Sequence, residues 1–267
     1  MVGNGPRNNR KMFLQEIPPV SWLTIQLSET ANSERGFFIK WGLVLYLAWI
    51  IAFEAVGRYA AMLPAHDLTV SLDRGIPLIP SFIWPYLFCY FFPCLLAFVV
   101  RDWHRVCRGI LSVLFANLTA FVVYLAFPVA FPKPELAGSI SARVLWAEYV
   151  VDFQPGANNL PSLHVAFAWL VYLICLKQGL KRIVEYALFL VALLITVSTL
   201  FVKQHILADV VIGTIWALGS WIAAGYFYPR WTQRGADAKA AFRQVARRSV
   251  PFIAVTILLM VIFAVWR

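Results

Sequence analysis

The chain has 267 residues, of which 61% are hydrophobic and only 13% are charged, and its net charge at pH 7 is +10. A soluble domain is nearer to half apolar and a quarter charged, so this composition excludes an ordinary soluble protein and indicates a membrane protein with several spans. In such a protein a basic balance reflects loops rich in Lys and Arg, so we expect the lipid bilayer and no nucleic acid as a partner.

Residues 1–36 are polar or amphipathic and form the first of three expected regions. Pro18 and Pro19 interrupt any helix in this region. The apolar residues between Val20 and Leu27 suit a segment that lies in the membrane interface. The first long apolar run begins only near Phe37, so we expect no signal peptide here.

Seven apolar segments follow, and each approaches the length of about 20 residues that a membrane-spanning helix needs. They cover residues 37–63, 77–100, 109–131, 162–177, 183–202, 206–228 and 249–266. This pattern predicts an all-α membrane bundle, with a six-helix core over residues 37–228. Residues 229–267 are then a basic loop followed by a seventh, C-terminal span. The alternative is that the last segment is a peripheral helix.

The distribution of basic residues predicts the orientation of the spans. Most of the 23 Lys and Arg residues lie in the N-terminal tail and in the loops after the second, fourth and sixth spans. Because basic loops stay in the cytoplasm, we expect the N-terminus to be cytoplasmic. The loop 132–161 and the turn 203–205 then lie on the extracytoplasmic face, where spans four and six begin. His164 and His205 should therefore lie at the same depth of the same membrane face.

His205 and Asp209 are the first candidate pair for chemistry. They are four residues apart, so they share one face of a helix. Asp209 can accept a hydrogen bond from one ring nitrogen of His205, which would leave the other nitrogen as a nucleophile. The alternative is a polar pair that only joins two helices.

His164 is the second candidate, because it lies near an expected helix start. Pro161 suits the first turn of a helix, and Asn158, Asn159 or Ser162 can cap it. The free amides of a helix start favour an anion such as phosphate. His164, one turn inside, can donate a proton to a leaving oxygen as a general acid.

Lys133 and Lys203 are expected on the same face, where they can neutralise phosphate charge, and Ser198 is close to Lys203 in sequence. Two histidines, one carboxylate, two lysines and a helix start together predict a phosphoryl-transfer site. The sequence shows no Cys/His cluster with the spacing of a metal site, so we expect no metal and no cofactor.

Two short motifs resemble those of the type 2 phosphatidic acid phosphatase superfamily. Pro161-Ser162-Leu163-His164 is similar to the P-S-x-H signature, and the run from Ser198 to Asp209 is similar to S-R-x5-H-x3-D. The P-S-L-H form and the K-Q-H run resemble the branch that contains inositol phosphorylceramide synthases. The order of spans supports the resemblance over residues 37–228, which would be a six-span catalytic core.

The resemblance implies a membrane enzyme that acts on lipid phosphates or phospholipid headgroups without a metal. It implies that His205 carries the phosphoryl group as a phosphohistidine and that Asp209 orients it. His164 would protonate the departing alcohol and then activate water or an acceptor hydroxyl. The substrate phosphate would be held by Ser162 with its amide, Lys133, Lys203 and Ser198.

The chain departs from the superfamily pattern at two positions. Thr199 stands where the third signature has Arg, and Lys203 is expected to replace that charge. The first signature, K-x6-R-P, is degraded: Lys133-Pro134 matches its end, but Ala126 stands at the leading Lys. Fewer fixed cations favour a diester donor or a lipid acceptor over a plain monoester phosphatase.

The long loop between spans three and four carries one more expected element. Residues 139–153 alternate in a helix-like way, which predicts an interfacial helix beside the site, either a substrate lid or a surface cover. We expect its acidic residues, Glu148 and Asp152, to be solvated. Two other functions stay open: a proton-coupled lipid transporter, and an inactive member that only binds lipid.

Overall fold

The structure is a computed structural model that describes residues 20–152 and 156–265. Most of the expected N-terminal segment, including Pro18 and Pro19, lies outside the described residues. Within the described ranges every regular element is a helix, which confirms the all-α bundle. The first helix, α1 (Val20–Ala60), begins well before the apolar run that predicted it.

Among the residues that the structure describes, six helical stretches are long and apolar enough to cross a membrane. The seventh apolar helix, α7 (Leu163–Cys175), has 13 residues and a length of about 20 Å, which is shorter than the apolar part of a bilayer. The long stretches are α1, the run η1–α3–η2–α4 (Pro80–Phe82, Ile83–Phe91, Phe92–Leu95 and Leu96–Val99), α5 (Trp103–Ala126), α8 (Arg182–Phe201), α9 (Leu207–Trp231) and α10 (Ala238–Val265).

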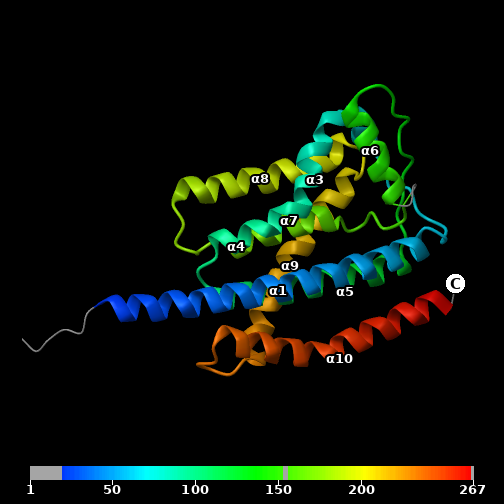
Figure 1. Cartoon of the computed structure of the whole chain (residues 1–267). Helices are drawn as coiled ribbons and strands as arrows, with labels where there is room; N and C mark the ends of the chain where they lie inside the picture. The colour runs from blue at the N-terminus through cyan, green and yellow to red at the C-terminus, as the bar shows by residue number, and fades with distance from the viewer. Residues whose placement is uncertain (1–19, 153–155, 266–267) are drawn as a thin grey trace, which may run out of the picture.

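The apolar helices alternate in direction, so their connections collect at the two ends of the bundle (Figure 1). One end holds the chain from α1 to α3, which includes α2 (Ser71–Gly75), the long loop after α5, and the turn between α8 and α9. The opposite end holds the connections 100–102, 176–181 and 232–237, together with most of the basic loop residues. The two predicted motifs therefore lie at the same end.

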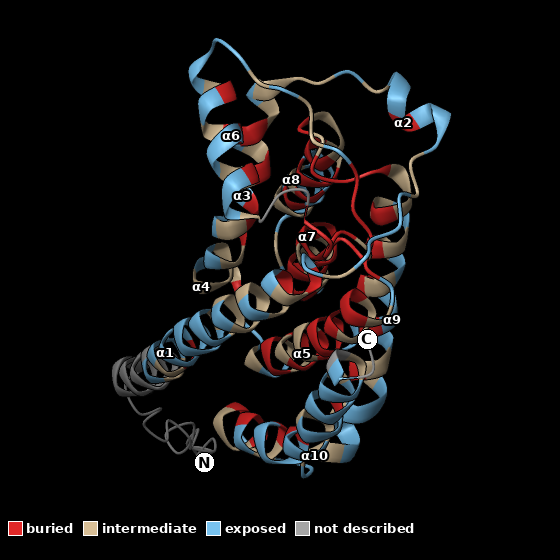
Figure 2. Ribbon diagram, turned by 90° about the vertical axis from the view of Figure 1, so that its right-hand side faces the viewer, coloured by how far each residue is buried: buried red, intermediate tan, exposed pale blue. Residues whose placement is uncertain are grey.

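The short helix α7 is the centre of the bundle and packs against α5, α8 and α9. Figure 2 shows α5 and α7 as mostly buried, whereas α1 and α10 are mostly exposed along the outside. Because lipid chains are as apolar as leucine, exposed apolar residues on outer helices are what a membrane protein requires.

Small residues let α9 approach its neighbours closely. Gly213 shows this most clearly, because a Cβ atom there would lie 2.6 Å from the carbonyl oxygen of Ser162. Real Cβ atoms do not come so near, so the start of α7 and the first turns of α9 touch backbone to backbone. Close contacts of this kind are a main source of packing energy between helices in a membrane.

The helix predicted from residues 139–153 is present as α6 (Ile140–Val151), with Ser139 as its N-cap. Its buried side carries Leu145 and Tyr149, and the Tyr149 hydroxyl donates to the carbonyl oxygen of Val202 at 2.6 Å. Its outer side exposes Trp146 and other apolar residues. The helix is thereby tied to the turn that precedes His205.

Candidate active site

His205 lies in the tight turn between α8 and α9, and Asp209 lies in the first turn of α9. The Oδ2 atom of Asp209 is 3.2 Å from Nδ1 of His205 and accepts the amide of Ile206 at 3.1 Å. Asp209 is fully buried, and His205 is 7% exposed. An ionised carboxylate can only accept hydrogen bonds. The proton of a neutral His205 ring is therefore held on Nδ1, which leaves Nε2 as the free nucleophilic nitrogen.

Asp73, a residue of α2, supports the same turn. Its Oδ1 accepts the amide of Leu207 at 2.7 Å, and its carbonyl oxygen accepts the Lys203 ammonium at 2.8 Å. Two carboxylates, Asp73 and Asp209, thus satisfy amides at the start of α9, where negative charge is favourable. Lys203 has a φ of 53°, a left-handed conformation that a non-glycine residue adopts only with local support.

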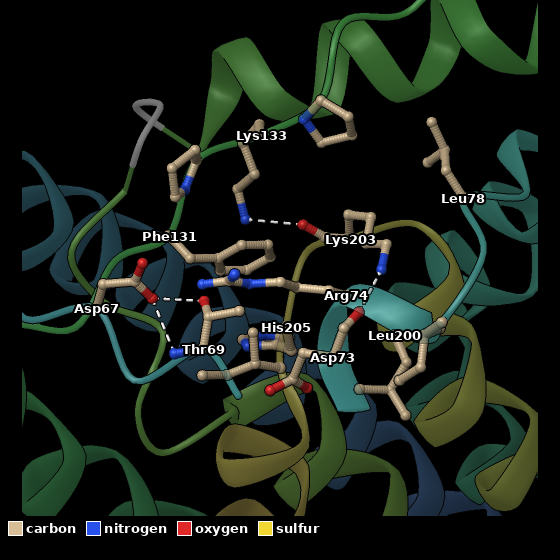
Figure 3. Close-up of a pocket in the computed structure, with 14 residues that line it drawn as sticks. Asp67, Thr69, Asp73, Arg74, Leu78, Phe131, Lys133, Leu200, Lys203 and His205 are labelled. Carbon is tan, nitrogen blue, oxygen red and sulfur yellow. Dashed lines mark hydrogen bonds between the residues drawn. The ribbon is translucent and has the colours of Figure 1, made fainter. Parts of the chain in front are cut away.

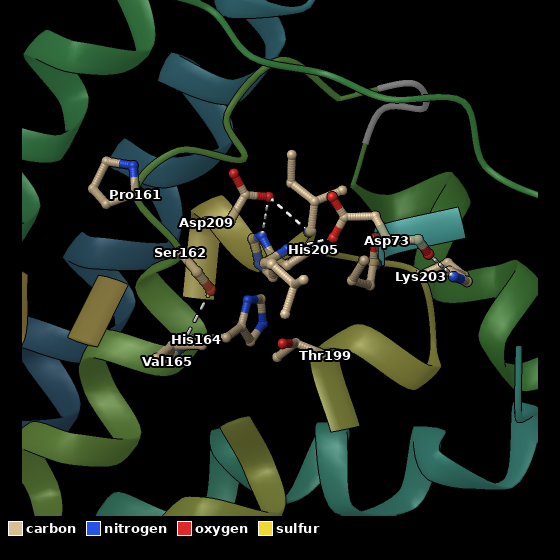
Figure 4. Close-up of polar contacts among 12 residues, drawn as sticks. Asp73, Pro161, Ser162, His164, Val165, Thr199, Lys203, His205 and Asp209 are labelled. Carbon is tan, nitrogen blue, oxygen red and sulfur yellow. Dashed lines mark hydrogen bonds and ion pairs between the residues drawn. The ribbon is translucent and has the colours of Figure 1, made fainter. Parts of the chain in front are cut away.

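His164 lies in the first turn of α7, directly beside His205 (Figure 4). The two ring centroids are 5.9 Å apart, so a single phosphoryl group can contact both rings. Ser162 is the N-cap and accepts the amide of Val165, which confirms one of the three expected caps. Pro161 lies before the cap and not in the first turn, and its carbonyl oxygen accepts the Tyr124 hydroxyl at 2.8 Å.

Both ring nitrogens of His164 contact tyrosine hydroxyls from α3. Nε2 lies 3.1 Å from the hydroxyl of Tyr90, and Nδ1 lies 3.4 Å from that of Tyr86. The Tyr90 hydroxyl in turn donates to Glu148 of α6 at 2.9 Å. The expectation that Glu148 is solvated is therefore wrong, because α6 turns this carboxylate inward onto α3.

A pocket of about 390 Å³ opens over His205 at this end of the bundle (Figure 3). Its wall combines apolar side chains with three cations, Lys133, Lys203 and Arg74, and two carboxylates, Asp67 and Asp73. The complete lining is Asp67, Thr69, Asp73, Arg74, Ile76, Leu78, Phe131, Pro132, Lys133, Pro134, Leu200, Lys203, His205 and Ile206.

The two lysines of the pocket donate hydrogen bonds to backbone carbonyl oxygens. The Lys133 ammonium donates to the carbonyl oxygens of Lys203 and Gln204, at 3.1 and 2.9 Å. Burial lowers the pKa of Lys133 to about 8 and also lowers that of Lys203. Among the described side chains, no carboxylate lies within ion-pair distance of these lysines or of Arg74. Asp73 and Asp67 still act on Lys203 and Arg74 from a longer distance, so the three cations exceed the two carboxylates of the wall by one charge.

Comparison with known families decides the membership of the chain. Residues 77–223 match the family model of the PAP2 superfamily, which is more than half of the chain and includes both motifs. The chain belongs to the PAP2 superfamily. Neither a curated protein nor a solved structure matches it. The superfamily membership and the apolar helices together support a membrane protein of the lipid-phosphatase type.

The structure brings together most of the residues predicted from the PAP2 motifs, but not all. His205, Lys133 and Lys203 line the pocket, whereas His164 and Asp209 do not line it but lie next to His205. Ser162 is fully buried, and its amide donates to the carbonyl oxygen of Asp209 at 3.3 Å.

Ser198 is also fully buried, and its hydroxyl donates to the carbonyl oxygen of Ile195 within α8. Neither serine lines the pocket. Thr199, at the position of the superfamily's Arg, donates to Thr196 in the same helix.

The sequence did not predict the roles of Asp73 and Arg74, which precede residues 77–223. It also did not predict the contact between Tyr90 and Glu148. One signal for Asp73 and Arg74 was present in the sequence: they are an adjacent acidic and basic residue in a polar loop, on the same expected membrane face as the two motifs. For metals, no group of three or more His, Cys, Asp or Glu side chains in residues 20–152 and 156–265 is placed to hold an ion.

Proposed function

We propose that this PAP2 protein is a metal-independent lipid phosphatase or phosphotransferase that works through a phosphohistidine. One observation carries the proposal: His205, paired with Asp209, lines a pocket with three cations, none of which lies within ion-pair distance of a carboxylate among the described residues. A buried histidine with one nitrogen held by a carboxylate is the arrangement of an activated nucleophile. Unpaired cations around it select an anionic substrate.

In the first step Nε2 of His205 attacks the phosphorus atom of the lipid donor. A bond forms between Nε2 and phosphorus, and the bond from phosphorus to the departing alcohol oxygen breaks. His164 begins this step as an imidazolium and gives one proton to that oxygen, so the alcohol leaves neutral and the His164 ring becomes neutral. Asp209 stabilises the positive charge that develops on the His205 ring, as a carboxylate does for a catalytic histidine.

In the second step a water molecule or an acceptor hydroxyl gives its proton to His164 and attacks phosphorus. The bond from phosphorus to Nε2 breaks, which restores His205 and releases phosphate or the new phosphoester. Lys133, Lys203 and Arg74 hold the non-reacting phosphate oxygens in both steps. We assign Ser162 to shaping the start of α7, whose free amides face an anion favourably. Ser198 stays a predicted binding residue.

The donor is proposed to be a membrane lipid with a phosphate or a phospho-headgroup. Ile76, Leu78 and Leu200 give the pocket wall an apolar side that suits the first part of a lipid chain. Thr199 adds no cation, which continues to favour a diester donor, as in the branch of inositol phosphorylceramide synthases. The acceptor is then a lipid hydroxyl in place of water.

The test is phosphate release by the purified protein in detergent, measured on a panel of lipid phosphates and compared with His205→Ala. We expect release that disappears in the variant. If no monoester is hydrolysed, a labelled diester donor with a hydroxyl acceptor is supplied, and transfer that depends on His205 is expected. Turnover that survives in His205→Ala contradicts the mechanism. Absence of both reactions supports the lipid-binding alternative.

A further inference from the structure

The two histidines of the site are each held on one side by a carboxylate, but in different ways. Asp209 contacts Nδ1 of His205 directly, whereas Glu148 reaches Nε2 of His164 through the hydroxyl of Tyr90. The hydrogen bonds from Glu148 through Tyr90 to His164 join three elements that are far apart in sequence: α6, α3 and α7. The two distances in it, 2.9 and 3.1 Å, are those of ordinary hydrogen bonds.

We propose that Glu148 is a positioning residue for His164: through Tyr90 it holds a proton on Nε2 and leaves Nδ1 to serve the substrate. This inference rests on the proposed function, in which His164 is the general acid and base. Nδ1 contacts the Tyr86 hydroxyl at 3.4 Å, a longer distance than the one at Nε2. A substrate oxygen can replace that weaker contact more easily than it can replace Tyr90.

The direction of the hydrogen bonds depends on the charge of Glu148. An ionised Glu148 accepts the Tyr90 hydrogen, and the Tyr90 oxygen then accepts the hydrogen on Nε2 of His164. A protonated Glu148 can instead donate to Tyr90, whose hydrogen then turns toward Nε2 and drives the ring proton to Nδ1. The charge of one carboxylate thereby sets the tautomer of a histidine two hydrogen bonds away.

The surroundings of Glu148 place this change near neutral pH. Burial and, to a smaller extent, the charge of Asp152 raise the pKa of Glu148 to about 7, although hydrogen bonds from Tyr90 and Tyr86 act in the opposite direction. Glu54 of α1 adds a small unfavourable charge. Because Glu148 is ionised above about pH 7, the productive tautomer is the one present at higher pH.

The first test is the pH profile of turnover for the wild type, Glu148→Gln and Glu135→Gln. Glu135 lies exposed in the loop before α6, so its variant is a matched loss of one charge. We expect wild-type kcat to rise with pH through about 7. In Glu148→Gln this rise disappears, and kcat at pH 8 falls about tenfold, a part of the usual contribution of a general acid–base. KM changes little, and Glu135→Gln matches the wild type.

Glu148→Gln with the wild-type profile overturns the inference. Tyr90→Phe removes the hydroxyl that links Glu148 to His164 but keeps the carboxylate. The rise of kcat through about pH 7 must therefore disappear in Tyr90→Phe as well, even if Glu148→Gln folds poorly.

A second measurement separates failure of this link from failure of the proposed function. The chain has only four histidines, so ¹⁵N spectra of histidine-labelled protein can resolve the His164 ring, assigned with His164→Gln. We expect the Nε2-protonated tautomer above pH 7 in the wild type and its loss in Glu148→Gln and Tyr90→Phe. That result supports the link even in a protein without turnover. An unchanged tautomer in both variants overturns it.

Discussion

At the scale of single residues, Asp209 has a structural and a chemical task. Its Oδ2 accepts the amide of Ile206, which completes the start of α9, and contacts the ring of His205. Asn at this position keeps the size of the side chain and an oxygen that caps the helix, but it removes the charge. The two tasks can therefore be separated by one substitution.

Asp209→Asn is expected to lower turnover by about a hundredfold or more, because the developing charge on His205 loses its partner. The unfolding free energy should change by about 1 kcal/mol or less, since the cap is kept. Turnover and thermal unfolding in detergent measure the two effects. Asp237→Asn is the matched control, since Asp237 accepts the amide of Ala240 at the opposite end of the bundle. An unfolded Asp209→Asn would instead favour a purely structural pair.

We predict a second pH effect, from Lys133. It makes the enzyme less effective as pH rises, whereas the effect of Glu148 raises kcat. The pKa of Lys133 is lowered to about 8, so its ammonium is charged below pH 8 and neutral above it. Binding of an anionic lipid should weaken as pH rises, and KM should increase up to about tenfold by pH 9, where about a tenth of Lys133 is charged.

The measurement is KM against pH for the wild type and Lys133→Arg. The arginine stays charged over this range, so the increase should be absent in the variant. A wild-type KM that is constant up to pH 9 would contradict a role of Lys133 in binding phosphate.

At the scale of helices, the contact of α7 with α9 sets the distance between the two histidines. Gly213→Ala would place a methyl group 2.6 Å from the carbonyl oxygen of Ser162 and must push the start of α7 away. We expect a large loss of turnover and a lower melting temperature. Gly219→Ala, in the same helix with open space around it, should have neither effect. Equal behaviour of the two variants would show that this spacing does not matter.

How far the elements could be predicted depends on the kind of signal each one carries. The apolar runs predicted helices because a bilayer leaves a long apolar segment few other conformations. The spacing of His205 and Asp209 predicted that these two side chains would meet, because residues four apart share one face of a helix, whereas Ser198 in the same motif does not line the pocket. The helix α6 was also predicted, because the apolar residues in 139–153 recur with the spacing of a helix.

The missed residues lack such a periodic or motif signal. Asp73 and Arg74 reach the site because α2 folds over the start of α9, and a five-residue helix leaves no period in the sequence. Glu148 was expected in water because a helical repeat shows which residues share a face, but not which helix that face meets. Tyr90 lies in an apolar run, where nothing marks its hydroxyl as a partner of His164.

At the scale of the whole molecule, the site belongs to one end of the bundle and the basic loops to the other. Apart from Leu200, in the last turn of α8, the residues that line the pocket come from connections at the same end, namely those before α3, after α5 and before α9. At the opposite end, Arg105 donates to the carbonyl oxygens of Leu173 and Ile174 at the end of α7. Cations at the C-terminal end of a helix are favourable, so this basic end is also fixed by the fold.

This polarity leads to the prediction that the pocket faces the extracytoplasmic side, because basic loops are retained in the cytoplasm. Single cysteines test it in intact cells with a membrane-impermeant maleimide, in a background where Cys94, the exposed native cysteine, is replaced by Ala. Glu135→Cys, near the pocket, should be labelled from outside, and Gln233→Cys should react only after lysis.

Val265→Cys should behave like Glu135→Cys if α10 spans the membrane, and like Gln233→Cys if it is peripheral. Labelling of Gln233→Cys alone in intact cells would place the pocket, and its lipid substrate, in the cytoplasmic leaflet.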